Sequence, residues 1–239
     1  MFSTKTDQNH LSQKFVLTAS EKRKYRESNP LPSVPYIPPP LPEDAKKILL
    51  VLDLDETLIH GTYCMPPKYD FRFELKLPQS KRVMNVYVLV RPYLQDFLEF
   101  AHKWFEVMAY TASLPIYADK ILDEIDPKRY IKHRLYRHHC GFFKEYYIKD
   151  LEFLGRPLSR ILLVDNHPAS YMVQRDNGIP IYSYLGQPRD AGLKSLVSFL
   201  DDVRDDVTPI PKTRQYGIIW RQKLQTFLEN LRESEESVS

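Results

Sequence analysis

One stretch of the chain, residues 48–60, constrains the fold more than any other. It begins with an unbroken apolar run, Ile48 to Leu52, and continues with two carboxylates two residues apart, Asp53 and Asp55. A short apolar run between a proline-rich segment and polar residues is typical of a strand buried on both faces of a parallel sheet. Ligands of open parallel sheets bind beyond the carboxyl ends of the strands. We therefore expect both carboxylates to project into a ligand-binding crevice.

The composition excludes several classes of protein. The chain has 239 residues, 43% hydrophobic and 27% charged, and its net charge of +3 is too small to indicate direct nucleic-acid binding. Cys64 and Cys140 form no CxxC pair, which argues against a zinc site or a disulfide scaffold and favours a reducing compartment. No apolar run is long enough for a transmembrane span, and Met1 to Ser20 lacks the apolar core of a secretory signal. We expect an intracellular protein, nuclear or cytoplasmic rather than mitochondrial.

A β-hairpin is predicted after the two carboxylates. Apolar and charged residues alternate from Phe71 to Leu77, which is the period of a half-exposed strand. A turn at residues 78–82 leads to a second apolar strand at Val83–Val90. Because the hairpin directly follows the carboxylates in the chain, we expect it to flank the site.

Strands and helices alternate through the rest of the predicted domain. This order is typical of an α/β protein, and we predict a Rossmann-like, doubly wound and mostly parallel sheet with the hairpin inserted after its first strand. The further strands are expected at Phe105–Tyr110, Arg160–Val164 and Ile179–Tyr182, and the helices from Arg91-Pro92, at Pro115–Ile125 and from Asp190 to about Val207.

Two terminal segments flank the predicted domain, which covers residues 46–208. Residues 1–45 are expected to form a Pro-rich, extended N-terminal arm, because the prolines crowded between Pro30 and Pro42 favour polyproline II. Residues 209–239 are expected to form an amphipathic helix and a polar tail. Both segments either pack on the domain or bind a regulatory protein partner. The apolar face of the C-terminal helix would consist of Trp220, Leu224, Phe227, Leu228 and Leu231.

Polar residues lie at the ends of several predicted strands. Carboxylates that converge on one crevice repel each other unless a cation lies among them, and carboxylate and carbonyl oxygens suit Mg²⁺. A metal, a lysine and a hydroxyl are the groups that stabilise phosphoryl transfer. An EF-hand loop starting at Asp53 is excluded, because its sixth and twelfth positions hold Leu58 and Cys64 instead of Gly and Glu. The candidate set is Asp53, Asp55, Thr111, Lys149, Asp165 and Asn166.

These residues resemble those of a known family. Asp53-Leu-Asp-Glu-Thr57 resembles the DxDxT signature of the haloacid dehalogenase superfamily phosphatases, and more narrowly the branch of the small RNA polymerase II C-terminal-domain phosphatases and Dullard. The resemblance extends from about Ile48 to Phe199. It includes Val90-Arg91-Pro92, Tyr110-Thr-Ala-Ser113 followed by Tyr117-Ala-Asp119, Tyr136-Arg137 with Cys140, Tyr147-Ile-Lys149-Asp-Leu151, Leu163-Val-Asp165-Asn166 and Pro168-Ala-Ser-Tyr171.

The resemblance implies a role for each candidate residue. Asp53 would be the nucleophile that forms an aspartyl phosphate, and Asp55 would protonate the leaving oxygen and then deprotonate water. Mg²⁺ would be held by Asp53, by the backbone carbonyl of Asp55 and by Asn166, with Asp165 acting through water or by orienting Lys149. The phosphate would be bound by Thr111, Lys149 and Arg137, and a hydrophobic pocket for a substrate proline would be formed by Tyr63, Val86, Leu114 and Tyr117.

The resemblance implies an enzyme, a Mg²⁺-dependent protein serine/threonine phosphatase with a haloacid dehalogenase-like domain at residues 46–208. The RNA polymerase II C-terminal domain is one candidate for its phosphorylated protein substrate. A mitochondrial import-receptor-like protein would use the same domain only to bind peptides, but the intact acids speak against this alternative. A Dullard-like phosphatase that regulates a lipid-metabolism enzyme is a further alternative.

Overall fold

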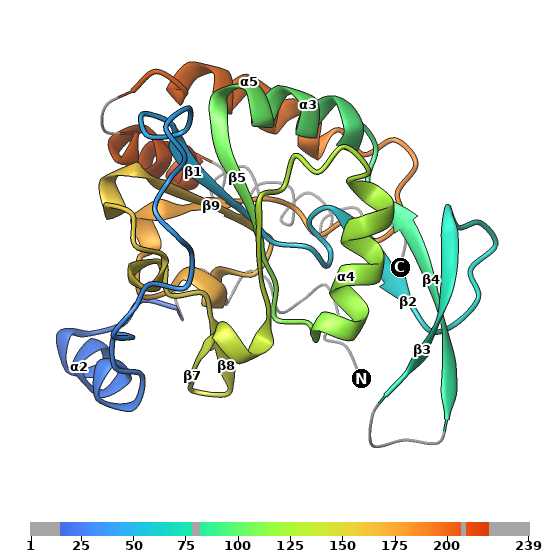
Figure 1. Cartoon of the computed structure of the whole chain (residues 1–239), viewed down its shortest axis with the longest axis horizontal. Helices are drawn as coiled ribbons and strands as arrows, with labels where there is room; N and C mark the ends of the chain where they lie inside the picture. The colour runs from blue at the N-terminus through green and yellow to red at the C-terminus, as the bar shows by residue number, and fades with distance from the viewer. Residues whose placement is uncertain (1–14, 78–81, 207–208, 220–239) are drawn as a thin grey trace, which may run out of the picture.

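A five-stranded parallel sheet lies at the centre of the computed structural model, which describes residues 15–77, 82–206 and 209–219 (Figure 1). The strand order is β10-β9-β1-β5-β6, and every neighbouring pair is parallel. Because β1 pairs with β5 on one side and β9 on the other, the direction of winding reverses at β1, where doubly wound sheets bind their ligands. The strands are β1 (Ile48–Leu52), β5 (Phe105–Tyr110), β6 (His133–Leu135), β9 (Ile161–Asp165) and β10 (Gly178–Pro180).

The two faces of this sheet are covered differently. One face packs against the apolar sides of α3 (Leu94–Trp104), α4 (Pro115–Ile125) and α5 (Gly192–Val203). The other face, which includes Leu49 and Val51, packs against short 3₁₀ turns and against Ile37 of the N-terminal segment. The alternating sides of β1 therefore enter two separate cores, as expected for a strand buried on both faces. The predicted α/β fold is confirmed.

The shorter elements connect these layers. A small antiparallel hairpin of β7 (Gly141–Phe143) and β8 (Tyr146–Ile148) precedes Lys149. Residues 210–219 are helical, and the apolar face predicted from Trp220 onward lies outside the described residues. No helix in the described ranges is both long and apolar enough to cross a membrane. The 3₁₀ turns are η2 (Arg137–His139), η3 (Leu151–Leu154), η4 (Leu158–Arg160), η5 (Pro168–Tyr171) and η6 (Arg175–Asn177).

The insertion after β1 is a three-stranded antiparallel sheet of order β2-β4-β3, one strand more than the predicted hairpin. The predicted strands are present as β3 (Phe71–Lys76) and β4 (Val83–Val90), and most of the predicted turn lies outside the described residues. The additional strand, β2 (Ile59–Thr62), pairs with the end of β4. It was missed because it has only four residues, one of them glycine, which is too short for a period-2 pattern.

Part of the N-terminal arm is helical, whereas the sequence predicted an extended arm. Helix α2 (Ala19–Ser28) begins with a capping box, in which the Thr18 side chain accepts a hydrogen bond from the Glu21 amide and Glu21 accepts one in return. Tyr25 of α2 is fully buried. The prediction considered only the prolines, which follow this helix. The division of the chain at residues 45/46 and 208/209 stays a prediction.

Candidate active site

The polar residues predicted from the strand ends lie together at the carboxyl edge of the parallel sheet. Asp53 follows β1, Thr111 follows β5, and Asp165 is the last residue of β9. Asp53 is held against β9, because its backbone N–H donates to the carbonyl of Val164 over 3.0 Å. The parallel arrangement thus brings together residues that are more than 100 positions apart in the chain.

Lys149 links two of the carboxylates. Its Nζ lies 2.5 Å from Oδ1 of Asp53 and 2.6 Å from Oδ2 of Asp165, and its side chain is 2% exposed. Burial alone would lower the pKa of Lys149, but the two carboxylates outweigh it and hold the ammonium charged. Burial raises the pKa of Asp53 to about 6, against the opposing charge of Lys149. Lys149 and its two carboxylate partners form a buried cluster of charges. A bound ligand that carries charge would change the balance of charge in this cluster.

Thr57 lies between Asp53 and Asn166. Its hydroxyl donates to Oδ2 of Asp53 over 2.8 Å and lies 3.3 Å from Oδ1 of Asn166. The turn that places it is tight, since Glu56 has a left-handed φ of 63°. The amide of Asn166 donates to Ser183 Oγ over 3.0 Å, which turns its oxygen toward Thr57. Thr57 belongs to the Asp53–Thr57 motif, but the sequence indicated no separate role for it.

Asp55 is surrounded by hydroxyl groups instead of by the lysine. Its Oδ1 accepts a 2.7 Å hydrogen bond from Tyr117, and its Oδ2 accepts one of 2.7 Å from Ser113 and a longer one of 3.4 Å from Thr111. Burial and the charge of Asp53 raise the pKa of Asp55, and the Tyr117 and Ser113 hydroxyls oppose that rise. The two acids therefore have different environments, as a nucleophile and an acid–base require.

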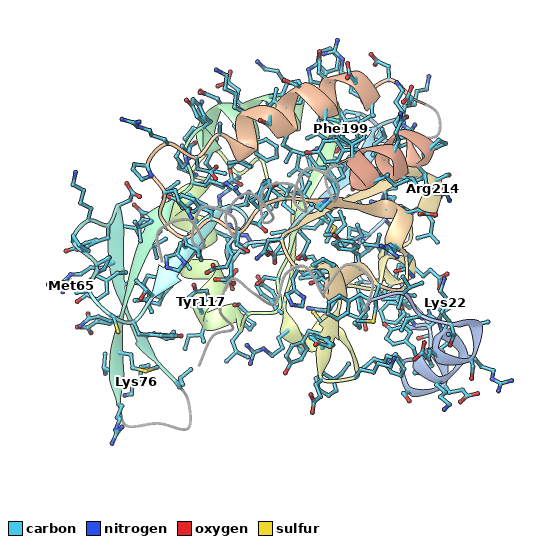
Figure 2. The ribbon with its side chains drawn as sticks, turned by 180° about the vertical axis from the view of Figure 1, so that it is seen from behind. Lys22, Met65, Lys76, Tyr117, Phe199 and Arg214 are labelled. Carbon is cyan, nitrogen blue, oxygen red and sulfur yellow. The ribbon has the colours of Figure 1, made fainter. Side chains whose placement is uncertain are left out.

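The sequence did not predict that two of these hydroxyl residues contact Asp55. Ser113 lies in the Tyr110–Ser113 motif, but a serine beside a threonine gave no separate signal. Tyr117 was assigned to an apolar pocket, whereas its hydroxyl contacts Asp55. It extends from α4 toward the inserted sheet (Figure 2), where a Cβ on Gly61 would lie 2.1 Å from its hydroxyl.

The donor set fits a hard cation held by mixed oxygen ligands. Within the described part of the chain, no group of three or more His, Cys, Asp or Glu side chains could hold a metal ion. A metal ion here would therefore need ligands of other kinds as well, such as the amide oxygen of Asn166. Both oxygens of Asp165 are occupied, one by Lys149 and the other by the backbone N–H of His167 over 2.7 Å. The oxygens of Asp53 and Asn166 converge on the Thr57 hydroxyl, and oxygens of this kind suit Mg²⁺.

Arg137 lies at the exposed rim of the site and touches none of the carboxylates. Its Nε donates to the carbonyl of Ala112 over 2.6 Å, and its guanidinium lies 5.2 Å from the centre of the Tyr147 ring. Its backbone N–H donates to the carbonyl of Ser113 over 3.0 Å. The two hydrogen bonds, to Ala112 and Ser113, attach Arg137 to the loop that also carries Thr111. A substrate at this loop would therefore meet the guanidinium.

The four residues of the predicted apolar pocket differ in accessibility. Tyr63 is 58% exposed and Leu114 is 38% exposed, so both are available to a ligand. Val86 is 1% exposed and lies in the core, where it supports the inserted sheet without reaching the surface. Tyr117 is partly buried and packs against Phe73, with ring centres 6.1 Å apart.

A buried arginine fixes the turn that carries the two acids. Arg91 donates from Nη1 to the carbonyl of Thr57 over 2.9 Å, and its Nε lies 2.7 Å from Oδ1 of Asp190. Its side chain is fully buried, and a Cβ on Gly192 would lie 2.4 Å from its Nη2. The sequence pattern identifies the Arg91-Pro92 pair, but it does not identify Asp190, the distant carboxylate that neutralises the guanidinium of Arg91.

Curated relatives match about 70% of the chain. "CTD small phosphatase-like protein 1" of Caenorhabditis elegans is 40% identical over 167 residues, which are 70% of this chain and 34% of the relative. "Phosphatase PSR1" of Saccharomyces cerevisiae is 41% identical over 166 residues, 69% of this chain and 38% of the relative. The human "Carboxy-terminal domain RNA polymerase II polypeptide A small phosphatase 1" is 38% identical over 177 residues, 73% of this chain and 67% of the relative. The matched region thus spans little more than a third of the first two relatives.

A solved structure shares the fold of this chain, and a family model matches most of its length. The RNA polymerase II CTD phosphatase Fcp1 of fission yeast, bound to beryllium fluoride, has a TM-score of 0.50 at 18% identity, covering 81% of this chain and 66% of that one. This likeness concerns the fold. The model of the NLI interacting factor-like phosphatases matches residues 48–209, which include every candidate site residue, and the predicted family is confirmed. The chain belongs to the family of NLI interacting factor-like phosphatases.

Proposed function

We propose that this chain is a Mg²⁺-dependent protein phosphatase that hydrolyses phosphoserine and phosphothreonine through an aspartyl phosphate on Asp53. The observation that carries the proposal is the different surroundings of the two acids. Lys149 and Thr57 bind the carboxylate of Asp53, whereas three hydroxyls bind that of Asp55. The family and its phosphatase relatives support a reaction of this class.

In the first step, an oxygen of Asp53 attacks phosphorus and the bond between phosphorus and the serine oxygen breaks. Asp55, protonated at this stage, transfers its proton to the leaving oxygen, so the products are the free hydroxyl and an acyl phosphate on Asp53. The ammonium of Lys149, which lies 2.5 Å from the nucleophile, offsets the negative charge that gathers around the phosphoryl group.

In the second step, water attacks the phosphorus of the acyl phosphate. Asp55, now ionised, accepts a proton from that water, and the bond between phosphorus and the Asp53 oxygen breaks. Inorganic phosphate is released with Asp53 as a carboxylate and Asp55 protonated, so both acids return to their starting states. The hydroxyls of Tyr117 and Ser113 hold the Asp55 carboxylate in one orientation for both transfers.

Mg²⁺ would be held by Asp53, Asn166 and the backbone carbonyl of Asp55. When bound, it would neutralise charge on the phosphoryl oxygens. Thr57, whose hydroxyl contacts both Asp53 and Asn166, orients the two side-chain oxygens for this purpose.

The substrate we propose is a phosphorylated protein segment. The human relative is named as a small phosphatase of RNA polymerase II, and we extend that substrate to this chain as a candidate. The rim offers Arg137 for phosphate and exposed apolar groups at Tyr63 and Leu114 for neighbouring substrate residues. A nuclear or cytoplasmic location is part of this proposal. A regulatory partner at either terminal segment stays a prediction.

One assay tests the reaction. We expect the chain to hydrolyse an aryl phosphate only when Mg²⁺ is present, and Asp53→Asn to abolish turnover. Asp55→Asn should also remove most activity, because it can neither donate nor accept the proton. The control is Asp96→Asn, which changes an exposed carboxylate on α3 and should leave the rate unchanged. If the folded wild-type chain is inert with Mg²⁺ yet binds peptides, it is a binding protein and the proposal fails.

A further inference from the structure

We propose that helix α2 belongs to the catalytic unit and positions Lys149 through Asp150. The helix precedes residues 48–209, the segment that the family model matches, so the family resemblance gives it no role. The inference rests on the proposed function of Lys149 as the group that offsets charge beside Asp53. Its basis is a set of contacts between α2 and the residue next to Lys149.

Asp150 is a fully buried carboxylate that depends on α2 for half of its side-chain partners. Its Oδ2 accepts a 2.9 Å hydrogen bond from the hydroxyl of Tyr25 and lies 2.9 Å from Nη1 of Arg26. Its Oδ1 accepts from Gln174 over 2.8 Å and from the backbone N–H of Glu152 over 3.2 Å. A buried carboxylate that loses its partners is strongly destabilised, so its backbone must shift or admit water.

A shift at Asp150 would reach Lys149 directly because the two residues share a peptide bond. The backbone of Lys149 is also held by a 2.8 Å hydrogen bond from its N–H to the carbonyl of Ser170. Its ammonium bonds to Asp53 and Asp165 at 2.5 and 2.6 Å, and such short contacts are sensitive to small displacements. Misplacing a catalytic group by about 1 Å can cost a factor of 100 in rate.

The β7–β8 hairpin has room for Tyr25 only because residue 141 is glycine. A Cβ at Gly141 would lie 2.3 Å from the Tyr25 hydroxyl and 3.0 Å from its ring. The same hairpin binds the end of α2, since the backbone N–H of Phe142 donates to Oδ1 of Asn29 over 3.0 Å. Figure 1 shows α2 beside this hairpin, which is consistent with these contacts.

The attachment of α2 is largely polar. Tyr25 is the only buried residue of the helix itself, and its polar contacts include ion pairs of Arg26 with Asp150 and Glu152 and of Lys144 with Glu21. Phe15 and Leu17, just before the helix, are buried in the same apolar cluster as Tyr25. A helix with so little buried apolar surface opens at a lower free energy than the core of the domain. The link from Tyr25 to Asp150 therefore makes the placement of Lys149 sensitive to whether α2 is docked.

The test compares two tyrosines of the same arm in the full chain. Tyr25→Phe removes the hydroxyl that bonds to Asp150 but keeps the ring, which packs against Phe143 at 5.9 Å. Tyr36→Phe is the matched control, because within the described residues the Tyr36 hydroxyl makes no hydrogen bond, while its ring packs against Phe153 at 5.4 Å. Asp150→Asn and the double variant with Tyr25→Phe complete the set.

For aryl phosphate hydrolysis with Mg²⁺, we expect Tyr25→Phe to lower kcat by about 3- to 30-fold and to change KM by less than about twofold. Tyr36→Phe should match the wild type. The double variant should be no slower than Asp150→Asn alone, because both changes break one link. Amide hydrogen exchange of residues 146–154 should become faster in Tyr25→Phe and not in Tyr36→Phe.

The outcomes separate this inference from the proposed function. If the wild type is inactive, the proposed function fails, and the exchange rates of residues 146–154 still decide whether α2 restrains the segment around Lys149. If Tyr25→Phe speeds exchange but leaves kcat unchanged, α2 is only structural and the positioning role is wrong. The inference is also wrong if Tyr25→Phe and Tyr36→Phe have equal exchange rates. It is wrong as well if Tyr25→Phe and Asp150→Asn lower kcat independently of each other.

Discussion

The hydroxyl of Tyr117 donates a 2.7 Å hydrogen bond to Oδ1 of Asp55. This contact joins α4 to the turn after β1. It places the hydroxyl of Tyr117, a residue that the resemblance assigned to an apolar pocket, beside the proposed acid–base Asp55. A hydrogen bond to a carboxylate stabilises its ionised form and therefore lowers its pKa. The strength of this contact helps to set the pH at which Asp55 changes its protonation state.

Tyr117→Phe should move the pH profile of kcat to higher pH. Burial and Asp53 raise the pKa of Asp55, Tyr117 opposes them, and its removal raises that pKa further. Ionised Asp55 is needed to accept the proton from water, so the acidic limb of the profile should move to higher pH and activity at acidic pH should fall. The profile is measured with an aryl phosphate, and the control is Tyr93→Phe, which changes an exposed tyrosine directly before α3. A profile that stays in place or moves to lower pH would contradict the role of this hydrogen bond.

Gly61→Ala should impair the enzyme through the same tyrosine. A Cβ at this position would lie 2.1 Å from the Tyr117 hydroxyl and 3.3 Å from the ring carbon that bears it, so the side chain has to move away from Asp55. We expect a loss of kcat at least as large as that of Tyr117→Phe. In the Tyr117→Phe background the substitution should cost less, because the hydroxyl that clashes is absent. Kinetics of the two single variants and the double variant measure this coupling, and fully independent effects would show that the clash is relieved elsewhere.

The sequence predicted the site best where it depends on the ends of strands. Asp53, Thr111 and Asp165 each directly follow or end an apolar run, and parallel pairing brings such positions together without further information. The contacts of Tyr117 and Arg91 were not predictable in this way. Each is a side-chain hydrogen bond between residues that lie 34 to 99 positions apart in the chain. The residues next to Tyr117 and Arg91 form helical patterns that packing alone explains. Local periodicity carries no signal for pairs of this kind.

The same limit applies to the peripheral elements. Strand β2 is too short to show a period, and α2 is recognisable only from the capping box of Thr18 and Glu21, since its helical face buries a single residue. The boundaries of β5 and α4, by contrast, are those predicted, because an apolar run and a proline at the first helical position mark them locally.

Thr57→Val should slow the reaction without unfolding the domain. Valine has nearly the shape of threonine but cannot donate to Oδ2 of Asp53, so the buried carboxylate loses a 2.8 Å hydrogen bond. We expect kcat to fall by about 10- to 100-fold and the Mg²⁺ concentration for half-maximal activity to rise, since Thr57 also contacts Asn166. Thr62→Val is the control, because in the described part of the chain the Thr62 hydroxyl bonds to nearby Cys64 and not to the candidate site. An unchanged requirement for Mg²⁺ would show that Thr57 does not orient the metal-binding oxygens.

Glu106→Gln should destabilise the fold in a pH-dependent manner, far from the candidate site. Burial alone would raise the pKa of Glu106, but His133 and Arg156 outweigh it and lower the pKa from 4.5 to about 2. The ionised carboxylate therefore stabilises the native state above pH 4.5, and this stabilisation is lost as the pH falls toward 2. At pH 7 the variant should lose about 1–3 kcal/mol of unfolding free energy. Chemical denaturation of both proteins between pH 7 and 3 measures the difference, with Glu99→Gln on the exposed face of α3 as the control. A difference that stays constant or grows as the pH falls would show that the charge of Glu106 is not what stabilises β5.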